Sequence, residues 1–318
     1  MNRAAIVAAR ERIRAHVRHT PLLGSPALDA LAGRRVLLKA ECLQHTGSFK
    51  ARGGWAALSA LPPEVRARGV IAYSSGNHAQ GVARAAAAFG VPAVIVMPAD
   101  APGVKIANTR ALGGEVVLYD RATEDRDAIG ATMAASRGLS LVKPFDDAAV
   151  IAGQGTIGLE LLEDLPAGWR GEVLAPCGGG GLTSGLALAL EGSGARVRPV
   201  EPEGFDDTAR SLAAGRIERN ARLSGSVCDA IVTPSPGVLT FPILQRLCGP
   251  GLAVTDDQAL QAMVLAFRHL RVVLEPGGAV ALAAALFTPN LAPEVVAIGS
   301  GGNVDEAIFG AALARFGG

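Results

Sequence analysis

The segment VIAYSSGNHAQGVARAAAAFGVPAVIVM, residues 70–97, determines the fold class of this chain. Two short apolar runs, 70–73 and 93–97, flank an alanine-rich stretch, 79–89, that has the length and composition of a helix. Apolar strands that alternate with helices of about a dozen residues are typical of parallel α/β sheets, whose strands are buried on both faces. The segment therefore predicts a parallel sheet with helices packed against it.

The same alternation of strand and helix runs through most of the 318 residues. We expect strands at 36–40, 70–73, 93–97, 115–118, 172–175, 197–201, 252–254 and 295–298. We expect helices at 2–18, 55–61, 79–89, 104–112, 123–137, 148–162, 182–191, 239–247, 256–270 and 278–287 and from 304, with an irregular stretch to about 237. The sequence therefore predicts an α/β fold with two open, mostly parallel sheets flanked by helices, and a site in the cleft between them.

The overall composition is that of a globular protein, with 49% hydrophobic residues and a formal net charge of +1 from 30 basic and 29 acidic residues. This balance gives no electrostatic reason to bind nucleic acid or an anionic membrane. The apolar stretches are too short to span a bilayer, and the N-terminus lacks the apolar core of a signal peptide. The four cysteines form no CxxC pair. We therefore expect a cytoplasmic protein with reduced thiols that acts on small molecules and binds neither nucleic acid nor membrane.

Lysine is scarce in this chain and occurs only at positions 39, 50, 105 and 143. Lys50 belongs to QHTGSFKARGG, residues 44–54, a glycine-bearing loop that leads into an expected helix. A lysine acts as a nucleophile when a desolvated pocket or the positive potential of a helix start lowers its pKa. Lys39 closes an apolar run and Lys105 lies on an expected amphipathic helix. Lys50 is therefore the first candidate for a reactive amine, with an ordinary surface lysine as the alternative.

Three polar turns join an expected strand to an expected helix: YSSGNHA, residues 73–79; CGGGGL, residues 177–182; and IGSGGN, residues 298–303. Open α/β sheets bind ligands at such turns, and the amides at a helix start suit a carboxylate or a phosphate. Four consecutive glycines let backbone amides converge on an anion with no Cβ in the way, which favours a phosphate cradle over a costly structural turn. A helix cap explains 73–79 equally well, and a simple turn is the alternative for 298–303.

Three further patterns are ambiguous. Residues 153–158, GQGTIG, match the dinucleotide pattern GxGxxG by letter, but no expected strand precedes them, so we take the match as accidental. Residues 201–207, EPEGFDD, gather four carboxylates, which would suit Mg²⁺ or Ca²⁺, although solvated loop acids explain the composition more simply. Glu275, in LEPGG at 274–278, stands where an acid would cap the following helix.

Taken together, these motifs resemble the pyridoxal-phosphate enzymes of fold type II, the tryptophan-synthase-β-like class, and within it the threonine and serine dehydratase and serine racemase group. The match rests on TGSFK, SSGNH, IAGQGT, the four glycines, EP followed by DD, EPGG and SGGN, and runs from Thr20 to Asn303. The resemblance implies a small substrate-binding domain at 67–146 and a large cofactor-binding domain at 1–66 and 147–318. It also implies that IAGQGT is structural. We expect a homodimer or homotetramer.

The resemblance also implies roles for individual residues. Lys50 would carry pyridoxal 5'-phosphate as a Schiff base, with Phe49 against the ring, Asn77 at the phenolic oxygen and Ser300 at the pyridine nitrogen. The phosphate would bind to Gly178, Gly179, Gly180, Gly181 and Leu182. The substrate carboxylate would bind to Ser75, Gly76, Asn77 and His78. In metal-dependent members the acidic loop binds the ion, so Mg²⁺, Ca²⁺ or Mn²⁺ would be held by Glu201, the Phe205 carbonyl and Asp207.

The implied activity is elimination from a β-hydroxy amino acid such as L-threonine or L-serine. Lys50 would remove the α-proton, the cofactor would stabilise the resulting charge, and loss of the β-hydroxyl would lead to a 2-keto acid and ammonia. The neutral hydroxyl of Ser300 would leave the ring nitrogen unprotonated, which favours elimination. Lys50 and Ser75 are thus the expected catalytic residues.

Three alternatives stay open. Ser75 matches the base that acts on the opposite face in racemases, although Ala230 stands where racemases usually have glycine. Arg126 would reach the second carboxylate of 3-hydroxyaspartate, which makes a dehydratase of that substrate another alternative. The non-enzymatic alternative is a protein that binds the cofactor or a nucleotide without turnover.

Overall fold

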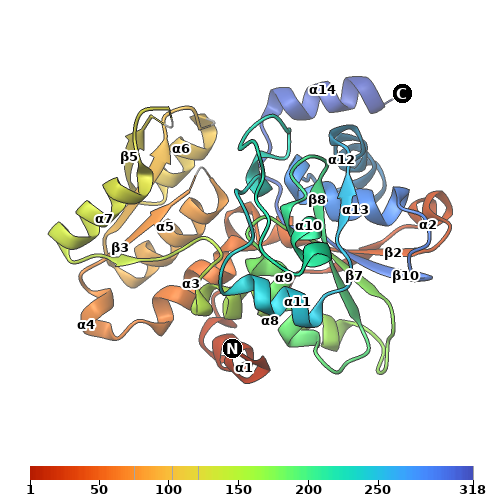
Figure 1. Cartoon of the computed structure of the whole chain (residues 1–318), viewed down its shortest axis with the longest axis horizontal. Coiled ribbons are helices and arrows are strands. Elements are labelled where there is room, and N and C mark those ends of the chain that lie inside the picture. The colour runs from red at the N-terminus through yellow and green to blue at the C-terminus, as the bar shows by residue number, and fades with distance from the viewer. Residues whose placement is uncertain (75, 102, 121, 318) are drawn as a thin grey trace.

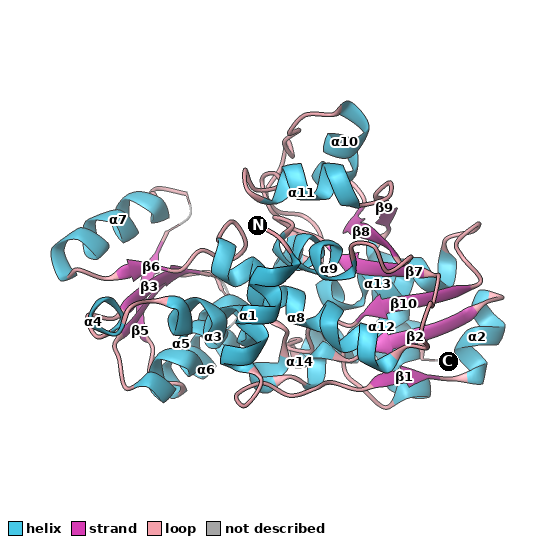
Figure 2. Ribbon diagram, turned by 90° about the horizontal axis from the view of Figure 1, so that it is seen from below, coloured by secondary structure: helices cyan, strands magenta, loops and turns pink. Residues whose placement is uncertain are grey.

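The computed structural model describes residues 1–74, 76–101, 103–120 and 122–317. They form two β-sheets with helices on both faces of each, and the two sheets lie in separate parts of an elongated molecule (Figures 1 and 2). The α/β class with two mostly parallel sheets is therefore confirmed.

The four-stranded sheet has the order β5-β4-β3-β6, and every pair in it is parallel. Its strands are β3 (Val70–Tyr73), β4 (Ala93–Pro98), β5 (Glu115–Tyr119) and β6 (Ser140–Leu141). One face packs on α3 (Lys50–Ala60), α5 (Asn77–Phe89) and α6 (Gly103–Ala111), and the other on α7 (Arg126–Arg137) (Figure 2). The short helix α4 (Pro63–Arg66) leads into β3. Because both faces are covered, β3 and β4 are buried throughout, which explains their continuous apolar sequences.

The six-stranded sheet has the order β1-β2-β10-β7-β8-β9, and only the β1–β2 pair is antiparallel. Its strands are β1 (Leu22–Gly24), β2 (Arg35–Lys39), β7 (Glu172–Pro176), β8 (Arg196–Pro202), β9 (Leu252–Val254) and β10 (Glu294–Ile298). One face packs on α13 (Pro276–Phe287), with α2 (Pro26–Ala32), α12 (Asp256–Leu270) and α14 (Glu306–Phe316) around it. The other face packs on α9 (Gly181–Leu190), with α1 (Arg3–Ile13), α8 (Ala148–Asp164) and α11 (Thr240–Leu247) beyond it.

Most expected elements are present, with small shifts at their ends. The strands at 70–73 and 252–254 have the predicted bounds, whereas the N-terminal helix ends at Ile13 and α3 begins at Lys50. Five short elements were not expected: β1, α2, α4, β6 and α10 (Asp207–Ala214). Two of the three missed helices, α2 and α10, end at a glycine in the left-handed region, Gly33 and Gly215, so a stop signal was present in the sequence. They are too short to show a clear helical period.

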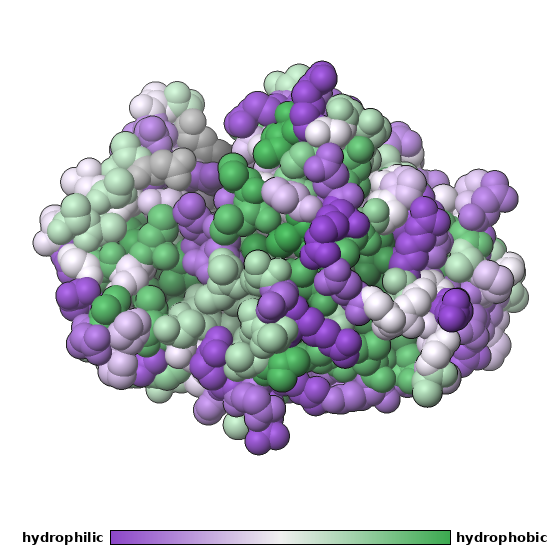
Figure 3. Space-filling model, turned by 60° about the horizontal axis from the view of Figure 1, so that its bottom comes forward, coloured by the Kyte–Doolittle hydropathy of each residue, from purple (hydrophilic) through white to green (hydrophobic). Residues whose placement is uncertain are grey.

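The remaining expectations concern the thiols, the membrane and the division into domains. All four cysteines are free thiols, as expected. Within the described part of the chain, no helix is both long and apolar enough to cross a membrane. Hydrophilic and hydrophobic residues are interspersed on the face shown in Figure 3, where a notch separates the two parts of the molecule. The division into domains stays a prediction, although every strand of the four-stranded sheet lies within residues 70–141.

Candidate active site

The site lies where several strands of both sheets end. Because β2, β10, β7 and β8 are neighbouring parallel strands, the loops that follow them leave the same edge of the six-stranded sheet. The loop after β2 is joined to the loop after β10 by a bridge between Ser48 and Gly301, and the Phe49 N–H donates to the Ser300 carbonyl at 3.0 Å. Three motifs that are far apart in the sequence therefore meet at one edge.

An inner cavity of about 200 Å³ occupies this meeting point. Every described cofactor or substrate candidate lines it: Phe49, Lys50, Gly76, Asn77, His78, Arg126, Gly178, Gly179, Gly180, Gly181, Leu182 and Ser300. Ser75 lies outside the described residues. The structure thus gathers the predicted residues around one space.

Lys50 is the first residue of α3 and its side chain reaches the inner cavity. Its Nζ atom donates to the Pro144 carbonyl oxygen at 2.7 Å and lies 5.1 Å from the centre of the Phe49 ring. Burial lowers the pKa of Lys50 to about 8, against the opposing effect of the Glu275 carboxylate. A much larger fraction of this amine is therefore neutral at physiological pH than for an ordinary lysine, and a neutral amine is the reactive form.

The four-glycine loop lies between β7 and α9 and has no room for side chains. A Cβ at Gly179 would collide with the Phe145 ring, and Gly180 has a φ of +90°, which side-chain-bearing residues rarely adopt. The amides at the start of α9 have no partners within the helix and carry the positive end of its dipole. The loop therefore presents backbone donors to the inner cavity, as an anion site requires.

The second polar turn, after β3, starts α5 and faces the cavity from the four-stranded sheet. Asn77, its first helical residue, donates from Nδ2 to Glu275 Oε1 and accepts at Oδ1 from Asn303 Nδ2 at 2.8 Å. Asn303 belongs to the third polar turn, so the two turns are joined across the cleft by their amides. This arrangement fixes the position of Asn77.

His78 is buried and neutral. Its Nε2 lies 2.9 Å from the Val142 carbonyl oxygen, which only accepts, so Nε2 carries the proton. Burial, together with the charge of the nearby Lys50, lowers the pKa of His78 to about 3. The imidazole therefore contributes no positive charge for an anion, and what this residue offers a carboxylate is its backbone N–H in the first turn of α5.

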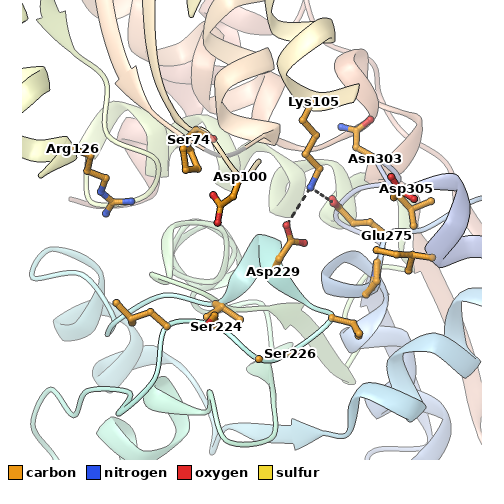
Figure 4. A pocket seen from close by; sticks show the side chains of 18 of the residues that line it. Ser74, Asp100, Lys105, Arg126, Ser224, Ser226, Asp229, Glu275, Asn303 and Asp305 are labelled. Atoms are coloured by element: carbon orange, nitrogen blue, oxygen red, sulfur yellow. Dashed lines mark ion pairs between the residues drawn. The ribbon is translucent and has the colours of Figure 1, made fainter. Parts of the chain in front are cut away.

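An outer cavity of about 420 Å³ shares part of its lining with the inner one. Figure 4 shows side chains that line the outer cavity. Six residues line both cavities: Ser74, Lys105, Arg126, Asp229, Val232 and Glu275. Arg126, the candidate for a second substrate carboxylate, is exposed at the start of α7. A ligand of the inner cavity that carried a charged side chain would extend toward these groups.

The acidic loop after β8 is separate from both cavities. Glu201 and Asp207 are buried, Glu203 is exposed, and Asp206 pairs with Arg210. Both Glu201 oxygens accept backbone N–H groups at the start of α10, from Thr208 at 2.9 Å and from Ala209 at 2.8 Å. This helix lies inside the stretch that was expected to be irregular, so the use of Glu201 as a helix-start acceptor was not foreseen.

The side-chain carboxylate of Asp207 accepts fewer of the hydrogen bonds found among the described residues than that of Glu201 does. Its Oδ1 accepts from Asn220 Nδ2 at 2.5 Å, whereas no hydrogen bond to its buried Oδ2 is found among the described residues. Burial raises the pKa of Asp207 to about 7 and raises that of Glu201 well above its usual value. No three His, Cys, Asp or Glu side chains in the described part of the chain gather as metal ligands. The loop therefore offers two buried carboxylates, plus the carbonyl of the buried Phe205.

The GxGxxG run lies inside α8, not at a strand-to-helix turn. Its glycines allow close helix packing, because a Cβ at Gly153 would lie 2.8 Å from the Arg52 carbonyl oxygen and one at Gly155 would lie 2.8 Å from that of Gly185. Thr156 in the same run contacts Arg52, a fully buried residue that forms ion pairs with Glu41 and Glu160. The run is therefore structural.

Two residues of the site were missed from the sequence. Lys105 was weighed as a reactive amine and passed over for Lys50 because it lies on an expected amphipathic helix, and Glu275 was expected to cap α13. In the structure Glu275 makes no side-chain cap, and its carboxylate lies between Asn77 and Lys105. The scarcity of lysine did single out Lys105 as one of four candidates, but its partners come from distant parts of the chain.

Known proteins identify the family. The sequence model of the family described as pyridoxal-phosphate dependent enzyme matches residues 13–301. The L-threo-3-hydroxyaspartate ammonia-lyase of Saccharomyces cerevisiae is 40% identical over 304 residues, covering 94% of this chain and 92% of that protein. The serine racemase of Oryza sativa subsp. indica is 38% identical over 310 residues, covering 95% and 90%. The solved structure of a threonine deaminase from T.th. is 46% identical with a TM-score of 0.90, covering 96% of this chain and 99% of that one. The chain therefore belongs to the family of pyridoxal-phosphate-dependent enzymes.

Proposed function

We propose that this enzyme converts a β-hydroxy amino acid, of the threonine, serine or 3-hydroxyaspartate type, to a 2-keto acid and ammonia: the β-hydroxyl leaves as water, and a water molecule then hydrolyses the resulting enamine, through its imine form, to the keto acid and ammonia. The observation that carries the proposal is the inner cavity, in which the Lys50 amine, the four-glycine loop and Ser300 face one space. Relatives named as ammonia-lyases for threonine and for 3-hydroxyaspartate support the reaction type.

The described residues fit pyridoxal phosphate. A primary amine of lowered pKa suits its aldehyde, and the amides of Gly178 to Leu182, in a loop too tight for side chains, suit its phosphate. The aromatic ring of Phe49 lies beside the amine, and Ser300 is buried at the cavity wall. We assign these residues to cofactor binding, together with Asn77 at the phenolic oxygen.

When bound, the cofactor supplies an electron sink for the charge that forms at the substrate α-carbon. The unprotonated Nζ of Lys50 is the group that accepts the α-proton, and its lowered pKa keeps part of the amine in that form. Ser300 offers a neutral hydroxyl to the ring nitrogen and adds no charge there, which favours loss of the β-hydroxyl over a persistent carbanion.

The substrate carboxylate would bind at the start of α5. The backbone amides of Gly76, Asn77 and His78 lie at the positive end of the helix dipole, and Gly76 and His78 line the same cavity as Lys50. A carboxylate held there would orient the α-carbon toward the amine. The hydroxyl of Ser75 is assigned to this loop by sequence alone.

The choice of substrate depends on the outer cavity. Arg126 lines it and would bind a second carboxylate, which favours 3-hydroxyaspartate among the candidates. Serine racemisation is the second candidate function, since a serine racemase is nearly as similar to this chain as the ammonia-lyases are. Racemisation would need a base on the opposite face of the substrate, which is the role assigned to Ser75.

We also propose that the acidic loop binds Mg²⁺, Ca²⁺ or Mn²⁺ through Glu201, the Phe205 carbonyl and Asp207. The buried Oδ2 atom of Asp207, which has no hydrogen-bond partner among the described residues, supports this, because a buried carboxylate without a cation is costly. The ion would stabilise the loop between β8 and α10.

The expected cytoplasmic location and the expected homodimer or homotetramer stay predictions from the sequence.

One assay separates the candidate functions. The purified enzyme with pyridoxal phosphate is incubated with L-threonine, L-serine, D-serine and both L-3-hydroxyaspartates, and 2-keto acid is measured. Keto acid from at least one of the L-hydroxy amino acids is the expected result. No keto acid from any of them would contradict the proposal, and chiral analysis of the remaining serine then detects racemisation.

A further inference from the structure

Lys105 crosses the cleft between the two sheets. It lies on α6, beside the four-stranded sheet, and its side chain is buried. Its Nζ atom is 3.6 Å from Glu275 Oε2 and 3.7 Å from Asp229 Oδ2, which belong to segments beside the six-stranded sheet (Figure 4). Its stem packs on Gly76, the residue before α5, where a Cβ would lie 2.5 Å from Lys105 Cδ. The ammonium is therefore held between both parts of the site.

The Lys105 ammonium matters most for the charge of the Glu275 carboxylate. Its carboxylate is buried, and among the described residues no hydrogen bond reaches its Oε2 atom. Three charged groups face it: Lys105 from α6, Lys50 from α3, and Asp229 from the short 3₁₀ helix Asp229–Ile231. Burial raises the pKa of Glu275, the nearby Asp229 raises it further, and Lys105 is the strongest opposing influence. Without the Lys105 charge, the pKa of Glu275 would rise further.

The ionised form of Glu275 matters because it decides how the Asn77 amide is oriented. A carboxylate only accepts hydrogen bonds, so the NH₂ group of Asn77 must face Glu275 Oε1. On the other side, Asn303 Nδ2 donates to the Thr46 carbonyl oxygen at 2.8 Å and to Asn77 Oδ1 at 2.8 Å. Both ends of the Asn77 amide are thereby assigned, and the second N–H of its NH₂ group has no hydrogen-bond acceptor among the described residues.

We propose that Lys105 is a positioning residue: it keeps Glu275 ionised, and Glu275 in turn holds Asn77 with one N–H available to a ligand of the inner cavity. A protonated Glu275 would be able to donate to Asn77 Oδ1, so the amide would no longer have a single favoured orientation. The inference rests on the proposed function, in which that N–H serves the phenolic oxygen of the cofactor.

The test uses the visible absorption of the cofactor-loaded protein, recorded from about pH 6 to pH 9, because loss of the Lys105 charge would move the pKa of the buried Glu275 carboxyl upward. The variants are Lys105→Gln, the double variant Lys105→Gln/Glu275→Gln, and the charge-keeping Lys105→Arg. Arg110→Gln is the matched control, because Arg110 is an exposed cation on the same helix. Cofactor affinity is measured in parallel by equilibrium dialysis.

We expect a pH-dependent transition in the Lys105→Gln spectrum that is absent from the wild type and from Arg110→Gln. The transition should vanish in the double variant, which has no carboxyl group left to titrate. Cofactor affinity of Lys105→Gln should fall about tenfold or more, as for a lost hydrogen bond to a charged group. Lys105→Arg should keep the wild-type spectrum. If Lys105→Gln does not fold, the spectrum of Lys105→Arg serves as the test.

Two results would overturn the inference alone: a Lys105→Gln spectrum with the pH response of the wild type, or a transition that persists in the double variant. A pH transition in Lys105→Arg would count against it as well. A wild-type protein that takes up no cofactor would overturn the proposed function and this inference with it. Cofactor uptake by the wild type therefore tests the proposed function, and the comparison of the variants with the wild type tests the role of Lys105.

Discussion

The Nζ atom of Lys50 donates a hydrogen bond to the carbonyl oxygen of Pro144, at 2.7 Å. Pro144 lies between β6, the last strand of the four-stranded sheet, and α8, which packs beside the six-stranded sheet. The amine is thus held by the segment through which the chain passes from one sheet to the other. A cofactor that took this amine would replace that hydrogen bond.

Removal of the amine should abolish cofactor attachment. In Lys50→Ala, borohydride reduction should leave no covalent cofactor on the protein by mass spectrometry, and turnover should fall by at least about a hundredfold, since no group remains to move the α-proton. Lys143→Ala is the control, because Lys143 is an exposed lysine nearby in the sequence. Covalent cofactor on Lys50→Ala would show that another lysine is the attachment site.

Cofactor uptake by the cofactor-free protein should depend on pH through Lys50. Its pKa is lowered to about 8, so the neutral amine is scarce below that pH and dominant above it. The uptake rate, followed by visible absorption, should rise about tenfold per pH unit below pH 8 and level off above it. A rate that continued to rise toward the pKa of an ordinary lysine would contradict the lowered value.

Gly179→Ala should damage the phosphate loop. The new methyl group would collide with the Phe145 ring, and such overpacking costs about 1 to 3 kcal/mol of the free energy of unfolding. Urea unfolding should measure this loss, and cofactor titration should show weaker binding. Gly310→Ala is the control, because a Cβ at Gly310, in α14, meets no other atom within 4 Å. Equal behaviour of the two variants would argue against a tight loop.

Divalent cations should stabilise the protein through the acidic loop. After chelation, addition of Mg²⁺, Ca²⁺ or Mn²⁺ should raise the melting temperature by a few degrees, because an ion that binds only the folded state stabilises it by mass action. Asp207→Asn should lose this response, whereas Glu203→Gln should keep it, since Glu203 is exposed. An unchanged melting temperature with all three ions would refute the metal proposal.

Arg126 should decide the preference for dicarboxylate substrates. Arg126→Gln should raise the KM for L-threo-3-hydroxyaspartate about tenfold or more while the KM for L-serine changes little, as for one lost charge-assisted hydrogen bond. Arg137→Gln, at the other end of α7, is the control, because Arg137 pairs with Glu115 at the surface. An equal effect on both substrates would mean that Arg126 does not bind the side-chain carboxylate.

Local sequence determined the strands, the helices and the turns that carry the chemistry. Three segments could be interpreted from their own residues and near neighbours: the apolar run at 70–73, the four glycines at 178–181 and the loop before Lys50. The reason is that strand burial, backbone freedom and helix starts are short-range properties. The resemblance of the assembled motifs to a known family then gave the cofactor. Short elements such as β1 and α10 were missed because too few residues carry their pattern.

Only the tertiary structure decided which charges meet. The sequence suggested a helix cap for Glu275 and a helix surface for Lys105, but these two residues lie 170 positions apart along the chain and join across the cleft. Likewise, Pro144 reaches Lys50, and Arg52 reaches Glu41 and Glu160, only after the sheets and helices have packed. Burial sets the pKa of such groups and the partners that they require, and burial is a property of the assembled fold, not of any segment.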